Sequence, residues 1–479
     1  MPLHHEGVLC IQRWRRGLSL LVAIFMLLQP ATSSTTTITP GDLAPRNNTD
    51  GLIDAADALI LRQFILGTQS PTVEELLAAD VAPLGNPDGL LNAGDLVVLQ
   101  RAVLGDIVLP PLPDSSAPEQ ADASLISATN LAQGEIEING AAGSVESEST
   151  VTLVNFETGA TAGFTANADG SFTGTIAGTT SHVFSVVVTD SSGNSSPSVS
   201  VATDDLLQLD IASPVNGITI NDDIAQVTGT FSGPPGTAVI VNGQTACTYG
   251  PNFFVDIPLE PGENTLKISA SIADGLHVER TQTVTSTGVT AFTVQADSPC
   301  GYAPHTVEFI LTNNTGNTVV QIDADYDGDG TTDLSTSDPS ASLAHTYSAA
   351  GIYPARFVIQ DDTAAQYIAT QTIVVTNLTD IDSQIRLVYN TMLDRLRVGA
   401  IDGALNQLTP TMQNNFKPVF QALGDSLPAV VNQLGSIAGG RIAGDLALYT
   451  VIRDESGTQM AYPVYLIRGN DGVWRIGQM

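Results

Sequence analysis

The chain has 479 residues, a formal net charge of −33, and only 5% aromatic and 14% charged residues. This length exceeds what one hydrophobic core organises and suits about four or five domains of roughly 100 residues each. The charge is uneven, because residues 41–379 hold 40 acidic against 6 basic residues whereas residues 380–479 hold 9 against 8. An acidic body repels nucleic acid and anionic membrane surfaces and attracts divalent cations, so nucleic acid is excluded as an expected partner.

The first 33 residues have the pattern of an export signal. Arg13, Arg15 and Arg16 form a positive segment, an apolar run of 11 residues follows, and small residues precede Ser34. The apolar run is shorter than the roughly 20 residues that a membrane span needs. We therefore expect cleavage of residues 1–33, no membrane span afterwards, and a secreted, periplasmic or cell-surface protein.

Residues 38–108 contain an internal repeat with an offset of 38 residues. Each copy has Asp-Gly, then Asp or Asn three residues later, then Asp three residues beyond, followed by an apolar helical run that ends in Leu-Gly. These positions correspond to positions 5, 6, 9 and 12 of an EF-hand loop, in which glycine makes the sharp turn and oxygen atoms converge on a hard cation. The helices are expected to begin near Asp57 and Asp95, where an acid is favourable at a helix N-terminus.

The repeat resembles the dockerin type I repeat, with four extra residues between loop positions 1 and 5 in both copies. The resemblance implies Ca²⁺ as the cofactor and the following ligands in the two loops: Asp42, Asn48, Asp50, Asp57 and the Leu52 carbonyl, then Asp80, Asn86, Asp88, Asp95 and the Leu90 carbonyl. Asp54 and Asn92 would act through water. The alternative is a pair of acidic turns that cap helices without metal. A unit of about 65 residues has little core, so metal binding would also supply folding energy.

The resemblance implies that the calcium-folded helix pair docks onto a cohesin, as it does in dockerins. The loop positions that carry recognition hydroxyls in the family are here Ala55-Ala56 and Ala93-Gly94. The sequence therefore leaves three alternatives for the partner: a cohesin-like domain, another surface protein or a part of the same chain.

A Pro-rich acidic linker at 109–121 precedes three segments with alternating apolar residues and regular turn signals. The first, 122–204, with HVFSVVVTDSSGNSS, resembles a bacterial Ig-like domain. The second, 205–288, with FFVDIPLEPGENTLKISA, resembles the Ig-like module of the glucodextranase-B type. The third, 289–377, with AAGIYPARFVIQDD, resembles a PKD domain. All three resemblances imply non-catalytic β-sandwiches.

Two further features of these sandwiches carry expectations. Asp325, Asp327, Asp329 and Asp333 copy EF-hand positions 1, 3, 5 and 9, which suggests a second, weaker cation site or else an acidic hairpin loop. His345 is expected to pack within its module and not to bind a metal. Cys247 and Cys300 fall in different sandwiches, and we expect two separate thiols unless the boundary brings them together.

From residue 378 the apolar residues follow a helical period. The pattern predicts a helix through 381–396, helices at 400–408 and 411–434 interrupted by Pro418 and Pro428, and strands at 447–453, 459–468 and 473–479. This order and the closing DGVWRI resemble the NTF2-like α+β cone, so residues 378–479 are expected to form one domain. Four aromatic residues are expected to be core and not to line a pocket: Tyr449, Tyr462, Tyr465 and Trp474.

The expected fold is a multidomain, mainly β string of modules: an N-terminal EF-hand-type helix pair, three Ig-like β-sandwiches and a C-terminal α+β cone. The chain has no HExxH, Gly-x-Ser-x-Gly or phosphate-loop motif and no Cys–His arrangement, so we expect no enzymatic activity. The expected function is a secreted or cell-surface, calcium-binding interaction or adhesion protein. The alternatives are an accessory protein of extracellular polysaccharide degradation, for which carbohydrate is a partner, and an enzyme acting in the C-terminal cone.

Overall fold

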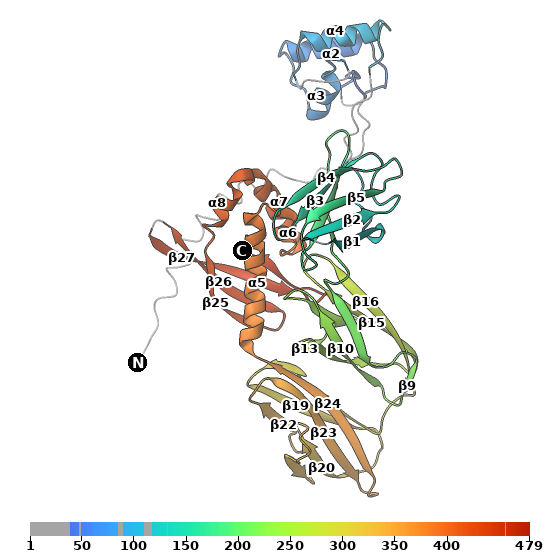
Figure 1. The fold of residues 1–479 in the computed structure, drawn as a ribbon, viewed down its shortest axis with the longest axis vertical. Coiled ribbons are helices and arrows are strands. Elements are labelled where there is room, and N and C mark those ends of the chain that lie inside the picture. Colours follow the sequence, from blue (N-terminus) through green and yellow to red (C-terminus); the bar gives the residue numbers. More distant parts are fainter. Residues whose placement is uncertain (1–38, 47–48, 85–89, 110–116, 132, 456) are drawn as a thin grey trace. The chain divides into compact units, whose positions relative to one another are not determined.

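The computed structural model describes residues 39–479 except 47–48, 85–89, 110–116, 132 and 456. The chain divides into two compact units, residues 1–115 and 116–479, and each is described by itself. The export signal and most of the linker lie outside the described residues. Strands hold 43% of the described residues and helices 18%, which confirms the mainly β character (Figure 1). No helix in the described part of the chain is both long and apolar enough to cross a membrane.

The first unit contains one helix for each copy of the repeat and a third helix between them. Its elements are α2 (Ala55–Ile65), α3 (Val73–Ala79) and α4 (Ala93–Val103). Leu61 and Leu99, which occupy the same position in the two copies, are completely buried in the shared core. The helices begin two residues before Asp57 and Asp95, and α3 was not predicted from the sequence.

The second unit begins with two consecutive β-sandwiches, whose cores are formed by alternating inward-facing residues. A short 3-10 helix, η1 (Ala123–Leu125), precedes the first. The first has one sheet of β1 (Ile126–Leu131), β2 (Glu135–Gly140) and β5 (Phe172–Ala177), and one of β4 (Thr161–Thr165), β3 (Thr150–Asn155), β6 (Phe184–Thr189) and β7 (Val199–Val201).

The second sandwich likewise has two sheets. One contains β13 (Cys247–Tyr249), β14 (Asn252–Pro258), β10 (Ile224–Ser232) and β8 (Gln208–Ser213). The other contains β12 (Gln244–Thr245), β11 (Ala238–Val241), β15 (Gly262–Ser271), β16 (His277–Ser286) and β9 (Ile218–Ile220). Most neighbouring strands are antiparallel, but β9 runs parallel to β16.

A third sandwich follows. Its small sheet contains β17 (Phe292–Ala296), β19 (His305–Asn313) and β22 (Ala344–Tyr347). Its larger sheet contains β18 (Cys300–Tyr302), β24 (Gln366–Thr376), β23 (Gly351–Asp361), β20 (Val319–Asp325) and β21 (Leu334–Thr336). The long hairpin of β23 and β24 forms most of this sheet and leads directly into the last domain.

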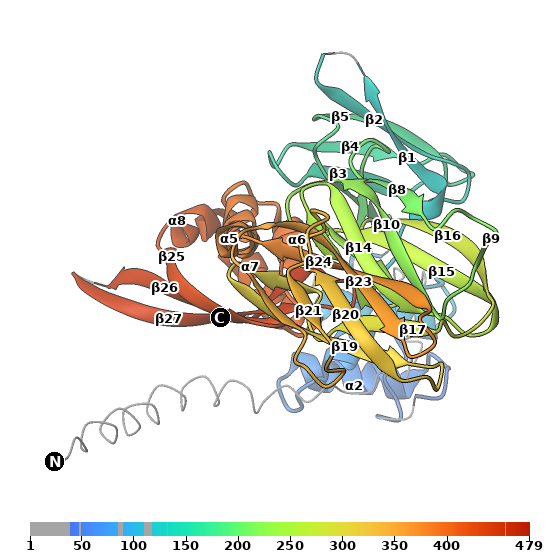
Figure 2. The same cartoon turned by 90° about the horizontal axis from the view of Figure 1, so that it is seen from below.

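The last domain packs helices against one face of an antiparallel sheet (Figure 2). Its elements are α5 (Leu378–Arg397), α6 (Ile401–Leu405), α7 (Pro410–Leu423), η2 (Gly424–Ser426), α8 (Leu427–Val431), β25 (Ser436–Ala443), β26 (Leu446–Glu455), β27 (Thr458–Arg468) and β28 (Trp474–Gln478). The sequence predicted three strands and missed β25, whose two adjacent glycines weaken the alternating pattern. The predicted interruption at Pro418 is wrong, because α7 runs through it.

The aromatic residues of this domain divide into two groups. Tyr449 and Trp474 are buried as expected, but Trp474 also lines a cavity, which corrects that part of its assignment. Tyr462 is exposed, which corrects its assignment to the core, and Tyr465 is half-buried. Both lie on β27, whose first six residues are exposed.

The domains of the second unit do not form a string of independent modules. A separate cluster of buried apolar side chains joins the first sandwich, the second sandwich and the last domain, with Phe156 and Val183 from the first, Leu206 and Ile272 from the second and Ala400 from the last. These three domains therefore share a small core besides the core that each has of its own.

Candidate docking unit and cation loops

The two predicted water-mediated residues of the helical unit are helix caps. The Asp54 side chain accepts the backbone N–H of Ala56 at the start of α2, at 2.6 Å. The Asn92 side chain accepts that of Gly94 at the start of α4, also at 2.6 Å. Both caps satisfy N–H groups that have no partner within the helix.

Asp57 holds the beginning of the first loop to the start of α2. It is 1% exposed, and its Oδ1 accepts the backbone N–H groups of Leu43 and Ala44, each at 2.7 Å. Its Oδ2 accepts the N–H of Asp54 at 2.6 Å. Both carboxylate oxygens are thus engaged by backbone donors.

Asp95 makes the same set of contacts in the second copy. Its Oδ1 accepts the N–H groups of Val81 and Ala82 at 2.9 and 2.8 Å, and its Oδ2 accepts that of Asn92 at 2.8 Å. Asp95 is completely buried. The arrangement is therefore a property of the repeat and not an accident of one loop.

Asp42 shows a different pattern. Its Oδ2 accepts the N–H of Gly51, which adopts a φ of +78° that favours glycine. Its Oδ1 is buried and has no hydrogen-bond partner among the described residues. Burial raises the pKa of Asp42, and the negative charges of Asp57 and Asp50 raise it further. A buried carboxylate oxygen without a donor, close to other acids, is chemically suited to a cation.

The remaining predicted ligands are placed as follows. Asp50 is exposed and accepts the N–H of Leu52, whose own side chain is exposed. Asp80 is buried at the end of α3, and the Leu90 side chain is exposed. Three of the predicted ligands lie outside the described residues: Asn48, Asn86 and Asp88. Within the described residues, the acids of the first loop do not form a group of three with oxygens close enough to share one ion.

The residues inserted in the first loop are fastened to α3. Arg46 donates to both carboxylate oxygens of Glu75 at 2.6 Å and lies over the Phe64 ring, 5.1 Å from its centroid. The contact with Arg46 lowers the pKa of the Glu75 carboxyl. The position equivalent to Arg46 in the second copy is Leu84, so this contact belongs to the first loop alone.

The helical unit exposes large apolar side chains in pairs that follow the repeat. Each residue of the first copy has its counterpart 38 positions later, and all six side chains are between 54 and 76% exposed: Leu52 and Leu90, Leu59 and Val97, Leu66 and Leu104. Leu59 and Val97 lie within α2 and α4, Leu66 and Leu104 are the C-caps of these helices, and Leu52 and Leu90 precede them. The same three positions are thus apolar and exposed in both copies, and we call these six residues the duplicated apolar face.

The acidic loop of the third sandwich does bring carboxylates together. Asp325, Asp327 and Asp333 each offer an oxygen within 4.8 Å of the others, whereas Asp329 is not part of this group. Asp325 accepts the N–H of Gly330, the glycine after the third acid, as Asp42 does with Gly51. Both loops therefore use their first acid to fix the glycine turn.

His345 has the packing role expected of it. Its ring lies against the rings of Tyr326 and Tyr347, with centroid distances of 4.7 Å in both cases. The imidazole is therefore part of an aromatic stack within the third sandwich.

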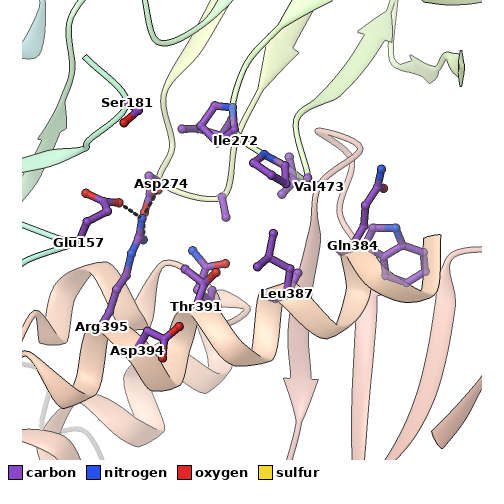
Figure 3. Close-up of a pocket in the computed structure, with 17 residues that line it drawn as sticks. Glu157, Ser181, Ile272, Asp274, Gln384, Leu387, Thr391, Asp394, Arg395 and Val473 are labelled. Atoms are coloured by element: carbon purple, nitrogen blue, oxygen red, sulfur yellow. Dashed lines mark hydrogen bonds and ion pairs between the residues drawn. The ribbon is translucent and has the colours of Figure 1, made fainter. Parts of the chain in front are cut away.

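A buried arginine lies where three domains of the second unit meet, beside a cavity of about 420 Å³ (Figure 3). Arg395 of α5 donates to the Asp274 carboxylate at 2.5 and 3.0 Å and to Glu157 at 2.8 Å. Its guanidinium also lies over the Phe156 ring. Burial lowers the pKa of Arg395, but the two carboxylates more than reverse this effect and raise it. Sequence reasoning missed this ion group, because its members are 121 and 238 positions apart.

The expectation of two separate thiols is wrong. Cys247 and Cys300 form a disulfide with their Cα atoms 5.6 Å apart. The bond joins β13 of the second sandwich to β18 of the third, beside β24, where Cys300 pairs with Val374. Gln371 of β24 also donates to Asp256 of β14 at 2.6 Å. The boundary between the two sandwiches thus brings these sheet edges together. This closeness is the exception under which we expect the two cysteines to pair.

These features define a mainly β modular protein with a separate helical unit and a braced body. Residues 47–104 match the dockerin type I domain. No curated protein matches the chain.

The chain is also similar to solved β-module structures. Fibronectin(III)-like modules of CbhA from Clostridium thermocellum are 17% identical over 36% of this chain and 96% of theirs, with a TM-score of 0.15. A Ca²⁺-stabilized adhesin with which an Antarctic bacterium binds ice is 19% identical over 53% and 75%, with a TM-score of 0.14. The FN1–FN3 domains of chicken CNTN1 are 13% identical over 55% and 99%, with a TM-score of 0.13. Likenesses at this level carry no argument about function.

Proposed function

We propose that the chain is an extracellular or cell-surface interaction protein without enzymatic activity, which docks a protein partner through its helical unit. The duplicated apolar face is the observation that carries this proposal. The match of residues 47–104 to the dockerin type I domain supports it, since such domains serve protein–protein docking. The β-sandwiches and the last domain then serve as the body that carries the docking unit.

The exposure of the face favours a partner over a purely structural role. Soluble proteins rarely leave several large apolar side chains exposed together unless something binds there. Leu61 and Leu99, at the other side of the same helices, are fully buried and already supply the core. The exposed residues are thus not needed to hold the helices together, and their recurrence in both copies is best explained by binding.

A Ca²⁺ ion is part of this proposal. Among the described residues of the first loop, Asp42 has the buried carboxylate oxygen that best fits a cation, and Asp50 and the Leu52 carbonyl would complete its neighbourhood. Asp80 and the Leu90 carbonyl are the corresponding groups of the second loop. Oxygen donors of this kind suit Ca²⁺, which would bring positive charge to an acidic loop and steady its turn.

The partner is proposed to be a cohesin-like domain or another surface protein. The test uses the full chain and measures its binding to a panel of immobilised cohesin domains and polysaccharides. The variant Leu59→Asp with Val97→Asp places charge on the duplicated apolar face. The matched control, Ile310→Asp with Ile368→Asp, changes two equally exposed apolar residues of the third sandwich.

Binding of a cohesin domain that falls at least tenfold in the first variant and is retained in the control is the expected result. Equal loss in both variants, or no effect of the first, would show that the duplicated face is not the docking surface. Binding to polysaccharide alone would instead favour the accessory role in polysaccharide degradation.

A further inference from the structure

The last acid of each loop has a role that the family's ligand pattern does not give it. In an EF-hand loop the acid at position 12 binds the cation with both carboxylate oxygens. Here that position is held by Asp57 and Asp95, and each accepts three backbone N–H groups through its two oxygens. The residues at position 12 therefore do not fit the role of a bidentate cation ligand.

We propose that Asp57 and Asp95 are backbone anchors and not calcium ligands, so that the helical unit keeps its fold without a divalent cation. The geometry explains why the two roles compete. An N–H donor brings the positive end of its dipole to the carboxylate, at the place a cation would take. Hydrogen bonds to an ionised acceptor are also among the strongest in proteins, and these six are all between 2.6 and 2.9 Å long.

The backbone donors of this arrangement lie at the start of each lengthened loop. Leu43 and Ala44 directly follow the first acid, and they donate the two N–H groups that Oδ1 of Asp57 accepts. In the second copy, Val81 and Ala82 donate in the same way to Asp95. In both copies the start of the loop is thus held against the first turn of the helix that follows it.

Other contacts of the helical unit also hold it without metal. Its core includes Leu43, from the first loop, together with Leu61 and Leu99 from the helices. Arg46 fastens the inserted residues to Glu75 of α3. A cation at Asp42 would add to this framework without being required by it, so the inference does not depend on the proposed docking function.

Hydrogen–deuterium exchange on the full chain, followed by mass spectrometry, tests the proposal without any partner. The wild type is compared in excess EDTA and in millimolar CaCl₂, with attention to peptides that contain Leu43, Ala44 and Asp54. Asp57→Asn weakens the anchor, and Asp106→Asn is the matched control because Asp106 is an exposed acid of the same unit that lies outside both loops. Since hydrogen bonds to charged groups are strong, Asp57→Asn should speed exchange at these amides by roughly tenfold or more.

The expected result is equal protection in EDTA and in calcium for the wild type, a loss of protection in Asp57→Asn under both conditions, and little change in the control. Protection that appears in the wild type only with calcium would overturn the proposal. So would protection that is unchanged by Asp57→Asn, or an effect of that variant that vanishes in EDTA. The docking test fails or succeeds separately, because it measures binding and not exchange.

Discussion

The helical unit and the body of the chain are held together by different kinds of contact. In the helical unit, the anchoring hydrogen bonds join residues 13 or 14 positions apart within one copy of the repeat. In the body, a buried ion group joins residues 121 and 238 positions apart, and a disulfide joins residues 53 positions apart. The first unit is stabilised locally and the second is braced between domains.

This difference follows from what each part can bury. A unit of about 70 residues has too little interior to depend on apolar burial alone, so hydrogen-bonded carboxylates complete its stability. The sandwiches have cores of their own, and their cross-domain contacts set how they are oriented to one another. The helical unit thus leaves large apolar side chains exposed, whereas Arg395 and Asp274, which brace the body, are buried.

Loss of the buried arginine should give the largest effect. Arg395→Met leaves Asp274 buried without its cation, and removing one partner of a buried ion pair costs about 3–5 kcal/mol. We expect the free energy of unfolding of the body to fall by this amount. Urea denaturation, followed by the fluorescence of the nearby Trp474, measures it. Exchange within residues 39–109 should stay the same, because the loss concerns the body alone.

Arg397→Met is the control for this variant. Arg397 pairs with Asp394 at the surface, where an ion pair contributes at most about 1 kcal/mol. A double variant that combines Arg395→Met with Asp274→Leu should regain part of the stability, since no buried charge is then left unpaired. Equal shifts in Arg395→Met and the control would show that the junction does not brace the body.

Removal of the disulfide should cause the second largest loss of stability. Cys247→Ser with Cys300→Ser releases the link between the second and third sandwiches, and losing a disulfide of this kind costs about 2–4 kcal/mol. The same urea experiment measures the change, and exchange should rise in β13, β18 and β24. Residues 39–109 contain no cysteine, so dithiothreitol should reproduce the effect in the body and leave the helical unit unchanged. Unfolding of the wild type that is insensitive to dithiothreitol would contradict this role.

The sequence predicted those features whose cause is local. The repeat with its helices follows from spacing and turn residues, and so do the alternating strands. The ligand assignment depended on aligning the loops to a known pattern, and no sequence rule shows that the extra residues return their N–H groups to Asp57. The ion group of Arg395 and the disulfide were missed because they depend on how domains pack, which periodicity within a domain does not describe.

The smallest effect is expected from a carboxylate in the body that resembles the anchors of the helical unit. Asp361 is buried, and its Oδ1 accepts the Oγ1–H and N–H of Thr363 and the N–H of Ala365. These hydrogen bonds, that of the Thr363 hydroxyl foremost, lower the pKa of Asp361 from 3.8 to about 2. Because the folded pKa lies below the unfolded one, the carboxylate stabilises the fold above pH of about 4 and loses this contribution as the pH falls towards 2.

Asp361→Asn should therefore lower the unfolding midpoint at neutral pH, and the difference from the wild type should shrink between pH of about 4 and 2. The control, Asp362→Asn, changes the exposed neighbouring acid and should lack that pH dependence. The test is to measure the urea unfolding midpoints of the wild type and the two variants across this pH range. A difference that stays constant down to pH 2 would mean that Asp361 acts through its shape and not its charge. Backbone anchoring by an ionised carboxylate would then be a property of the repeat and not of both units.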